Sequence, residues 1–321
     1  MVMQSYNFQP GEQKPYSVVI PCAQKDAKFV GKVMKYVWHN LKGCEHIYII
    51  AKNSLFGCIS KWVKKENPEK YAGGGYTLID ENSLVRGFNF DAVRDCLLSH
   101  PNVNAGRVGW YFQQFLKFAF AQTEYCGEYY LTWDADTLPT SQIYFFQDGH
   151  PLFTAKTEYH EAYFHTLEKL LGMGKTAPFS FIAEHMMFCK EVVFELIEAI
   201  NCSPVLGDSW FEKIINACDF KPDDGSIFSE FETYGTFCCL KHPDLYQVRQ
   251  LNTFRCAAML CGRHITDYVM KALSSLDIAT FEIYHDRVER RKLILQRRLA
   301  HPMRTARNAL KKLTRLVGRG S

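Results

Sequence analysis

The sequence of 321 residues has no long hydrophobic run. No stretch approaches the roughly 20 uninterrupted apolar residues that cross a bilayer. Residues 1–15 are polar and lack the apolar core of a secretory signal. We therefore expect a chain that stays in the cytoplasm, on the side of the membrane where it is made.

Cysteine pairs with the spacing of metal-binding or redox motifs are also missing. The 12 cysteines are scattered, include the adjacent Cys238 and Cys239, and nowhere form a Cys-x-x-Cys spacing. In a reducing compartment such cysteines are small buried hydrophobes. We expect neither a disulfide framework nor a zinc site.

Internal repeats and low-complexity linkers are absent as well. Glycine is missing from the loop IPCAQKD (residues 20–26), which follows the first apolar segment. A nucleotidyltransferase would need a Gly-rich, basic triphosphate loop there, so this absence counts against that class. The simplest division is one α/β domain, residues 1–286, with a basic helical extension, residues 287–321.

Acidic residues almost disappear from residue 287 onward. This segment holds 12 bases and only Glu289 as an acid, a net +11 in a chain of net charge +4, so residues 1–286 carry −7. Leucines recur among the bases at near-helical spacing, which is typical of helices on membrane surfaces. We expect peripheral attachment to the inner face of the cytoplasmic membrane. Each base near the anionic surface would contribute about 1 kcal/mol to the free energy of binding.

A solvated terminal helix and an oligomerisation helix remain alternatives for this basic tail. Nucleic-acid binding is not expected, because residues 1–286 are acidic and carry no nucleic-acid-binding motif.

Aromatic and β-branched residues are abundant. The chain has 24 Phe and 17 Tyr, enough for a large core. Residues 16–21 and 46–52 are apolar and predict two strands. Between them, apolar residues recur at helical spacing over residues 29–41. This β-α-β pattern predicts a mostly parallel, doubly wound α/β sheet. Further strands are expected at residues 76–80, 129–133, 142–146, 151–155, 180–188 and 281–285, and further helices at 61–70, 90–98, 107–121, 159–171, 190–200, 210–217 and from 228.

The apolar run YYLTW (residues 129–133) ends in Asp134-Ala135-Asp136. Two acids at the exit of a buried strand lie where open α/β sheets present ligands. Carboxylate oxygens, completed by phosphate oxygens and waters, suit a divalent cation. An acidic turn without function is the alternative for this tripeptide.

Polar side chains on the helix before this strand strengthen the first interpretation. Gln113 and Lys117 are four residues apart and share a face of a largely apolar helix. Unpaired burial of a polar group costs about 1–3 kcal/mol, so these side chains need partners. A nucleotide diphosphate or a structural carboxylate could supply them; we favour ligand contact for Arg107, Gln113, Gln114 and Lys117.

Three motifs together resemble the GT-A glycosyltransferases. They are GWYFQQFLK (residues 109–117), Asp134-Ala135-Asp136, and SEFETYG (residues 229–235). Within that class they are similar to a bacterial group found among polysaccharide-synthesis proteins of the capsule and lipopolysaccharide type. The resemblance covers roughly residues 16–285 and implies a nucleotide-sugar donor, a glycan or lipid-linked acceptor, and Mn²⁺ or Mg²⁺.

The resemblance also implies roles for residues. Asp136 would bind the metal directly and Asp134 would lie nearer the ribose, with a late histidine, His285 or else His264, completing the metal shell. Residues of the first strand and its loop would lie near the base and ribose of the donor: Pro21, Lys25 and Asp26.

Two acids are candidates for the base that an inverting transferase needs. Ser229-x-x-Glu232 is a capping-box pattern, which gives Glu232 a structural explanation and leaves Glu230 as the preferred base. Glu184 and His185 interrupt an apolar run, so either they form a hydrogen-bonded core pair or they line the acceptor and sugar pocket. Trp210 could stack on a sugar.

The sequence therefore predicts a metal-dependent glycosyltransferase. The alternatives are a nucleotidyltransferase of similar fold and a non-catalytic, membrane-docking scaffold protein with a degenerate transferase fold.

Overall fold

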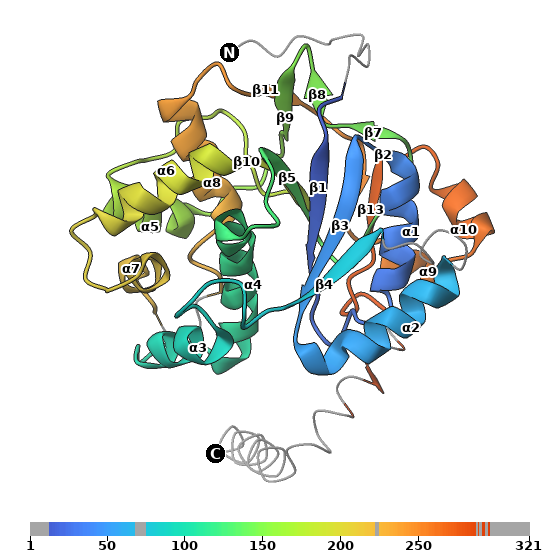
Figure 1. Ribbon diagram of the computed structural model, residues 1–321, viewed down its shortest axis with the longest axis horizontal. Coiled ribbons are helices and arrows are strands. Elements are labelled where there is room, and N and C mark those ends of the chain that lie inside the picture. The colour runs from blue at the N-terminus through green and yellow to red at the C-terminus, as the bar shows by residue number, and fades with distance from the viewer. Residues whose placement is uncertain are drawn as a thin grey trace, which may run out of the picture.

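The computed structural model describes residues 13–67, 75–221 and 225–286, with residues 288, 291, 292 and 295 beyond them. Its centre is a five-stranded sheet in the order β10-β5-β1-β3-β4 (Figure 1). The strands are β1 (Tyr16–Pro21), β3 (Cys44–Ala51), β4 (Tyr76–Asp80), β5 (Tyr129–Trp133) and β10 (His185–Cys189).

Four of these strands are parallel. β1 pairs in parallel with β3 and β5, β3 pairs in parallel with β4, and β10 runs antiparallel to β5. Val18, Val19 and Ile20 of β1 are fully buried, as expected for a parallel strand covered on both faces. The predicted α/β fold with a mostly parallel central sheet is confirmed.

Helices cover both sides of the sheet. Figure 1 shows one group beside β3 and β4, comprising α1 (Val30–Asn40), α2 (Phe56–Glu66), α9 (Ala257–Cys261) and α10 (Asp267–Ala272). The other group lies beyond β5 and β10: α3 (Phe90–Leu98), α4 (Val108–Ala119), α5 (Glu161–Leu171), α6 (Lys190–Asn201), α7 (Trp210–Ala217) and α8 (Glu230–Lys241). Short 3₁₀ turns are η1 (Asn53–Leu55), η2 (Ala105–Arg107) and η3 (Phe120–Gln122).

Three small sheets join the later chain to this centre. Their orders are β11-β9-β8, β12-β13-β6 and β2-β7. The strands are β2 (Leu41–Lys42), β6 (Thr137–Pro139), β7 (Ile143–Tyr144), β8 (Phe146–Gln147), β9 (His150–Thr154), β11 (Gln247–Arg249), β12 (Thr253–Phe254) and β13 (Ile278–Thr280). The antiparallel pairing of β13 with β6 brings the late chain to the Asp-x-Asp loop.

Some element boundaries differ from the prediction. The late strand is β13, because Ile278 and Ala279 are fully buried against β6, and His285 lies in the turn that follows. β10 begins only at His185, so Glu184 precedes the strand. The helix expected at 61–70 is α2 and ends at Glu66.

No helix in the described ranges combines the length and the hydropathy needed to cross a membrane. The predicted helical tail, residues 287–321, lies outside the described residues except for positions 288, 291, 292 and 295.

Candidate functional site

The Asp-x-Asp loop is a tight turn at the exit of β5. The amide of Asp134 donates to the carbonyl of Glu184 (3.0 Å), and the amide of Thr137 donates to the carbonyl of Asp134 (3.1 Å). The amide of Phe281 donates to the carbonyl of Asp136 (2.7 Å). Backbone bonds from two other segments thus hold the loop at the edge where the parallel strands end.

Three carboxylates from two loops meet at this edge. Asp26 lies in the loop between β1 and α1, and its field acts on Asp136 together with that of Asp134. Burial, and then repulsion from these two acids, raises the pKa of Asp136 to about 7, although Lys25 and Arg263 lower it in part. An ionised Asp136 is therefore costly here unless a further cation is present.

Asp26 is held by a buried ion pair. Arg263 Nη2 lies 2.8 Å from Asp26 Oδ1, and both side chains are more than nine-tenths buried. Lys25 Nζ lies 3.7 Å from the other oxygen of Asp26. Asp26 is therefore compensated by cations within the protein. Asp134, whose side chain is 42% exposed, is the most open of the three acids.

Lys117 joins two of the predicted site residues. This buried lysine of α4 lies 2.6 Å from Glu230 Oε1 and 3.5 Å from Asp134 Oδ1. Burial would lower the pKa of Lys117, but Glu230 and Asp134 outweigh it and raise the pKa above its ordinary value. The lysine stays charged and connects the first turn of α8 to the Asp-x-Asp loop.

The other polar residues predicted on this helix have different surroundings. Gln114 is buried, and its Oε1 accepts from the amide of Glu230 (3.2 Å) while its Nε2 has no hydrogen-bond partner in the described part of the chain. Arg107 stacks on Trp110 (4.5 Å) and bonds to Ser226. Gln113 is half-buried. Gln114 therefore joins Lys117 beside Glu230.

The two glutamates of α8 have different surroundings. Glu232 Oε1 accepts from Ser180 Oγ (2.6 Å) and from the amide of Phe181 (3.1 Å), and burial raises the pKa of Glu232. Ser229 Oγ accepts from the amide of Glu232 (3.2 Å), so one half of the expected capping box is present. Glu232 thus supports the segment at Ser180, whereas Glu230 points to Lys117.

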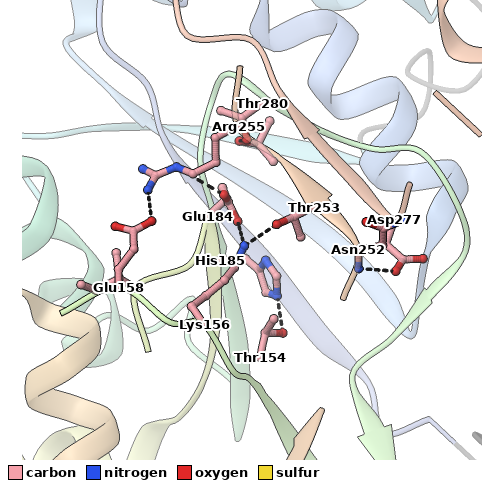
Figure 2. A network of polar contacts seen from close by, with 12 residues as sticks. Thr154, Lys156, Glu158, Glu184, His185, Asn252, Thr253, Arg255, Asp277 and Thr280 are labelled. Atoms are coloured by element: carbon pink, nitrogen blue, oxygen red, sulfur yellow. Dashed lines mark hydrogen bonds and ion pairs between the residues drawn. The ribbon is translucent and has the colours of Figure 1, made fainter. Parts of the chain in front are cut away.

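A second polar network surrounds Glu184 (Figure 2), the residue whose carbonyl accepts from Asp134. Glu184 is 2% exposed, and its two oxygens lie 3.2 Å from Lys156 Nζ and 3.5 Å from Arg255 Nε. Neither oxygen receives a hydrogen bond from the described residues. Arg255 also contacts Glu158 (2.6 Å), so Glu184 belongs to a connected ion-pair network.

His185 and Trp210 are core residues. His185 lies between Trp133 (ring centroids 5.1 Å apart) and Phe145 (5.4 Å), and its Nε2 bonds to Thr154 Oγ1 (2.9 Å). Burial, then Arg249 and Lys156, lowers the pKa of His185 well below its ordinary value, so the ring is neutral. Trp210 is 6% exposed, and its ring lies among Phe88, Phe115, Phe118 and Phe211.

The two histidines expected near a metal differ. His285 Nδ1 is buried without a hydrogen-bond partner in the described ranges, and His285 lies four residues after Phe281, which bonds to Asp136. His264 is exposed. Among residues 13–67, 75–221 and 225–286, no three His, Cys, Asp or Glu side chains gather closely enough to hold a metal by themselves.

This arrangement still fits a cation that arrives with a ligand. Mg²⁺ in particular is commonly bound by one or two carboxylates together with substrate phosphates, without a full protein cage. Asp134 and Asp136 supply the two carboxylates, and the raised pKa of Asp136 indicates an uncompensated negative field.

Sequence reasoning missed Arg263, Lys156 and Arg255. Arg263 and Arg255 lie in a region without a recognisable motif, and each finds its acid partner across a long sequence separation. The sequence gives only an indirect hint of them, because several buried acids need cations nearby.

No protein-family model matches the sequence, and no curated protein sequence matches it. Several solved structures are similar to the chain at low identity. Mouse xyloside xylosyltransferase 1 is 14% identical over 83% of this chain and 97% of its own, with a TM-score of 0.42. Galactosyltransferase LgtC is 12% identical over 83% and 86% (TM-score 0.40), and the bifunctional glycosyltransferase WbbM is 13% identical over 85% and 47% (TM-score 0.40). The side chains, and not these likenesses, carry the functional proposal.

Proposed function

We propose that this chain is a glycosyltransferase that binds a nucleotide-sugar donor with a divalent cation at the C-terminal ends of β1 and β5. The observation that carries this proposal is the meeting of Asp26, Asp134 and Asp136 at that edge, where open α/β sheets bind ligands. A cation bound with a diphosphate would compensate the field that raises the pKa of Asp136.

Asp134 and Asp136 would hold the cation, Mn²⁺ or Mg²⁺, with His285 as a further candidate ligand. When bound, the cation would neutralise charge on the departing nucleoside diphosphate. Pro21, Lys25 and Asp26, at the end of β1, would lie beside the nucleoside. Arg263 would keep Asp26 in place through its 2.8 Å ion pair.

Glu230 is our candidate for the base that takes the proton of the acceptor hydroxyl. Lys117 Nζ lies 2.6 Å from Oε1 of this carboxylate and 3.5 Å from Asp134 Oδ1. A diphosphate beside Asp134 would compete for Lys117 and leave Glu230 free to accept a proton. Lys117 would then couple donor binding to activation of the acceptor.

The acceptor would be a surface polysaccharide or a lipid-linked glycan. The supporting feature is the basic segment 287–321, which would hold the protein at an anionic membrane surface. Flotation with anionic liposomes checks this, with a chain ending at residue 286 as the comparison. Equal flotation of both proteins would remove the membrane from the proposal.

A thermal-shift experiment tests the donor site. Nucleoside diphosphates and nucleotide sugars are screened with Mn²⁺, with Mg²⁺ and with EDTA. A ligand at a hundred times its Kd adds about 2.7 kcal/mol to the free energy of unfolding. In a chain of this size we expect a rise in Tm of several degrees.

The cation dependence decides the outcome. We expect EDTA and the Asp136→Ala change each to abolish the shift. A nucleotide shift that survives both would favour a binding protein with a degenerate site. If no nucleotide raises Tm under any condition, the transferase proposal fails.

A further inference from the structure

A cavity of about 190 Å³ lies beside the Glu184 network. Its walls include Lys156, Glu158, Tyr159, Lys175 and Ser180. A larger cavity of about 310 Å³ lies at the other ends of β1 and β5, between Lys14 and Glu128, away from the acids. Only the first of these two shares side chains with the network that adjoins the Asp-x-Asp loop.

The walls of this cavity are fixed in position. The backbones of Lys156 and Ser180 exchange two hydrogen bonds (2.9 and 2.8 Å). Ser180 Oγ donates to the buried Glu232 of α8 (2.6 Å). Lys175 Nζ donates to the carbonyl of Phe179 (2.6 Å). A preformed cavity binds a ligand without a large ordering cost.

An aromatic ring is presented to solvent at this cavity. Tyr159 is 57% exposed, although its ring lies parallel to that of Phe164 at 5.5 Å (13° between the planes). Lys175 Nζ lies over both rings, 5.8 Å from the centre of Tyr159 and 5.0 Å from that of Phe164. Packing on Phe164 therefore orients the ring of Tyr159, which stays accessible to solvent and carries a polar hydroxyl at its edge.

Lys156 and Glu184 connect the cavity to the proposed donor site. Lys156, in the cavity wall, lies 3.2 Å from Glu184. The carbonyl of Glu184 accepts from the amide of Asp134 (3.0 Å). Figure 2 shows Lys156 and Glu184 directed toward each other, with Arg255 above them and Glu158 on its other side. Lys156 and Glu184 therefore link the cavity wall to the Asp-x-Asp loop.

Each charged side chain in the cavity wall already has a polar partner. Lys156 lies 3.2 Å from Glu184, Glu158 contacts Arg255 (2.6 Å), and Lys175 Nζ donates to the carbonyl of Phe179 (2.6 Å). A charged ligand would compete with these contacts or stay uncompensated. A neutral ligand rich in hydroxyl groups could bond to several of these groups and leave the contacts in place.

We propose that this cavity binds one neutral sugar unit at the acceptor end of the reaction, with Tyr159 as the ring against which the sugar packs. This inference rests on the proposed transferase function. The volume supports a single sugar, since sites for drug-sized ligands measure roughly 300–1,000 Å³, and a whole nucleotide sugar would not fit. The transferred group would then come from the Asp134 side and the acceptor from the Tyr159 side.

Saturation-transfer NMR on the full chain tests this proposal. The probes are the methyl glycosides of glucose, galactose, mannose and N-acetylglucosamine, each without nucleotide. We expect at least one to bind, and the Tyr159→Ala change to raise its Kd at least tenfold. The matched control is Tyr268→Ala, because Tyr268 is 82% exposed on α10 and is not part of the cavity.

A second variant guards against misfolding of the first. Lys175→Ala removes another cavity wall and is expected to raise the same Kd, while the Tyr268→Ala protein binds like the wild type. Binding that is equal in the wild type, Tyr159→Ala and Lys175→Ala proteins overturns the assignment, as does the absence of binding by all four glycosides.

The nucleotide shift, measured on the same samples, separates this inference from the function beneath it. A Mn²⁺-dependent nucleotide shift without glycoside binding refutes the sugar cavity alone. Glycoside binding that depends on Tyr159, without any nucleotide shift, supports the cavity and refutes the transferase proposal.

Discussion

Lys117 is the residue that links the candidate donor acids to the candidate base. It is buried, lies 2.6 Å from Glu230 and 3.5 Å from Asp134, and its charge lies 4.1 Å from the centre of the Phe231 ring. Its four-residue spacing from Gln113 predicts only a shared helix face. The partner is 113 residues away in sequence and could not be identified from spacing.

We expect the Lys117→Met change to destabilise the fold strongly. The change leaves Glu230 buried without its counter-charge, and removing one member of a buried pair costs about 3–5 kcal/mol. Urea unfolding measures the loss. The double change Lys117→Met with Glu230→Gln should recover much of it, because no buried charge is left unpaired.

The matched control is Lys61→Met, at an exposed position of α2. A surface change of this kind stays within about 0.5 kcal/mol of the wild type. If Lys117→Met loses no more stability than Lys61→Met, the pair with Glu230 is not a stabilising contact and its coupling role fails with it.

At the scale of single elements, α8 has a packing that its sequence hardly shows. Nine consecutive residues, from Glu230 to Cys238, are buried, so the helix has no solvent face along most of its length. A helix that is buried all round lacks the apolar stripe that reveals surface helices. The sequence therefore predicted where it begins, through the Ser229 cap, but neither its end nor its neighbours.

Gly235 on this helix allows close contact with Phe181. A Cβ at Gly235 would lie 2.4–2.6 Å from three ring carbons of Phe181. We expect Gly235→Ala to destabilise the protein by about 1–3 kcal/mol through overpacking, despite the better helix propensity of alanine. Thermal and urea unfolding would both show the loss.

Gly109 on α4 is the counterpart, because a Cβ there meets nothing within 4 Å. Gly109→Ala should stabilise the protein by about 0.4–1 kcal/mol. Opposite signs at the two glycines are the expected result. A stabilising Gly235→Ala would mean that α8 does not pack closely on Phe181.

At the scale of the whole molecule, the β-α-β opening and the apolar strands predicted the centre of the fold. The path of the late chain was not predictable, because β13 has only three residues and is defined by its pairing with β6. That pairing lets the amide of Phe281 donate to the carbonyl of Asp136, and His285 follows four residues later. The Asp-x-Asp motif was found from its position after β5, and Glu184 from its interruption of an apolar run, whereas Arg263 is brought to the acids only by tertiary contacts.

The global stability of the protein should depend on pH through Asp136. Burial and the neighbouring acids raise the pKa of Asp136 from 3.8 to about 7 in the folded protein. Between these values the folded state binds the proton more tightly than the unfolded state. The contribution of Asp136 to stability is therefore greatest below pH 3.8 and falls as the pH rises toward 7, at up to about 1.4 kcal/mol per pH unit.

Asp136→Asn removes this titration and should raise the free energy of unfolding at pH 7 by at least about 1 kcal/mol in EDTA. The difference between the two proteins isolates Asp136, because the contribution of His185, whose pKa is lowered in the folded protein, is the same in both. With Mn²⁺ and a nucleoside diphosphate the order should reverse, since only the wild type gains binding energy. An acid that lowers stability until its cation arrives is the expected cost of a binding site. Equal stability of the two proteins in EDTA across pH 4–7 would contradict the crowding of acids on which the donor site rests.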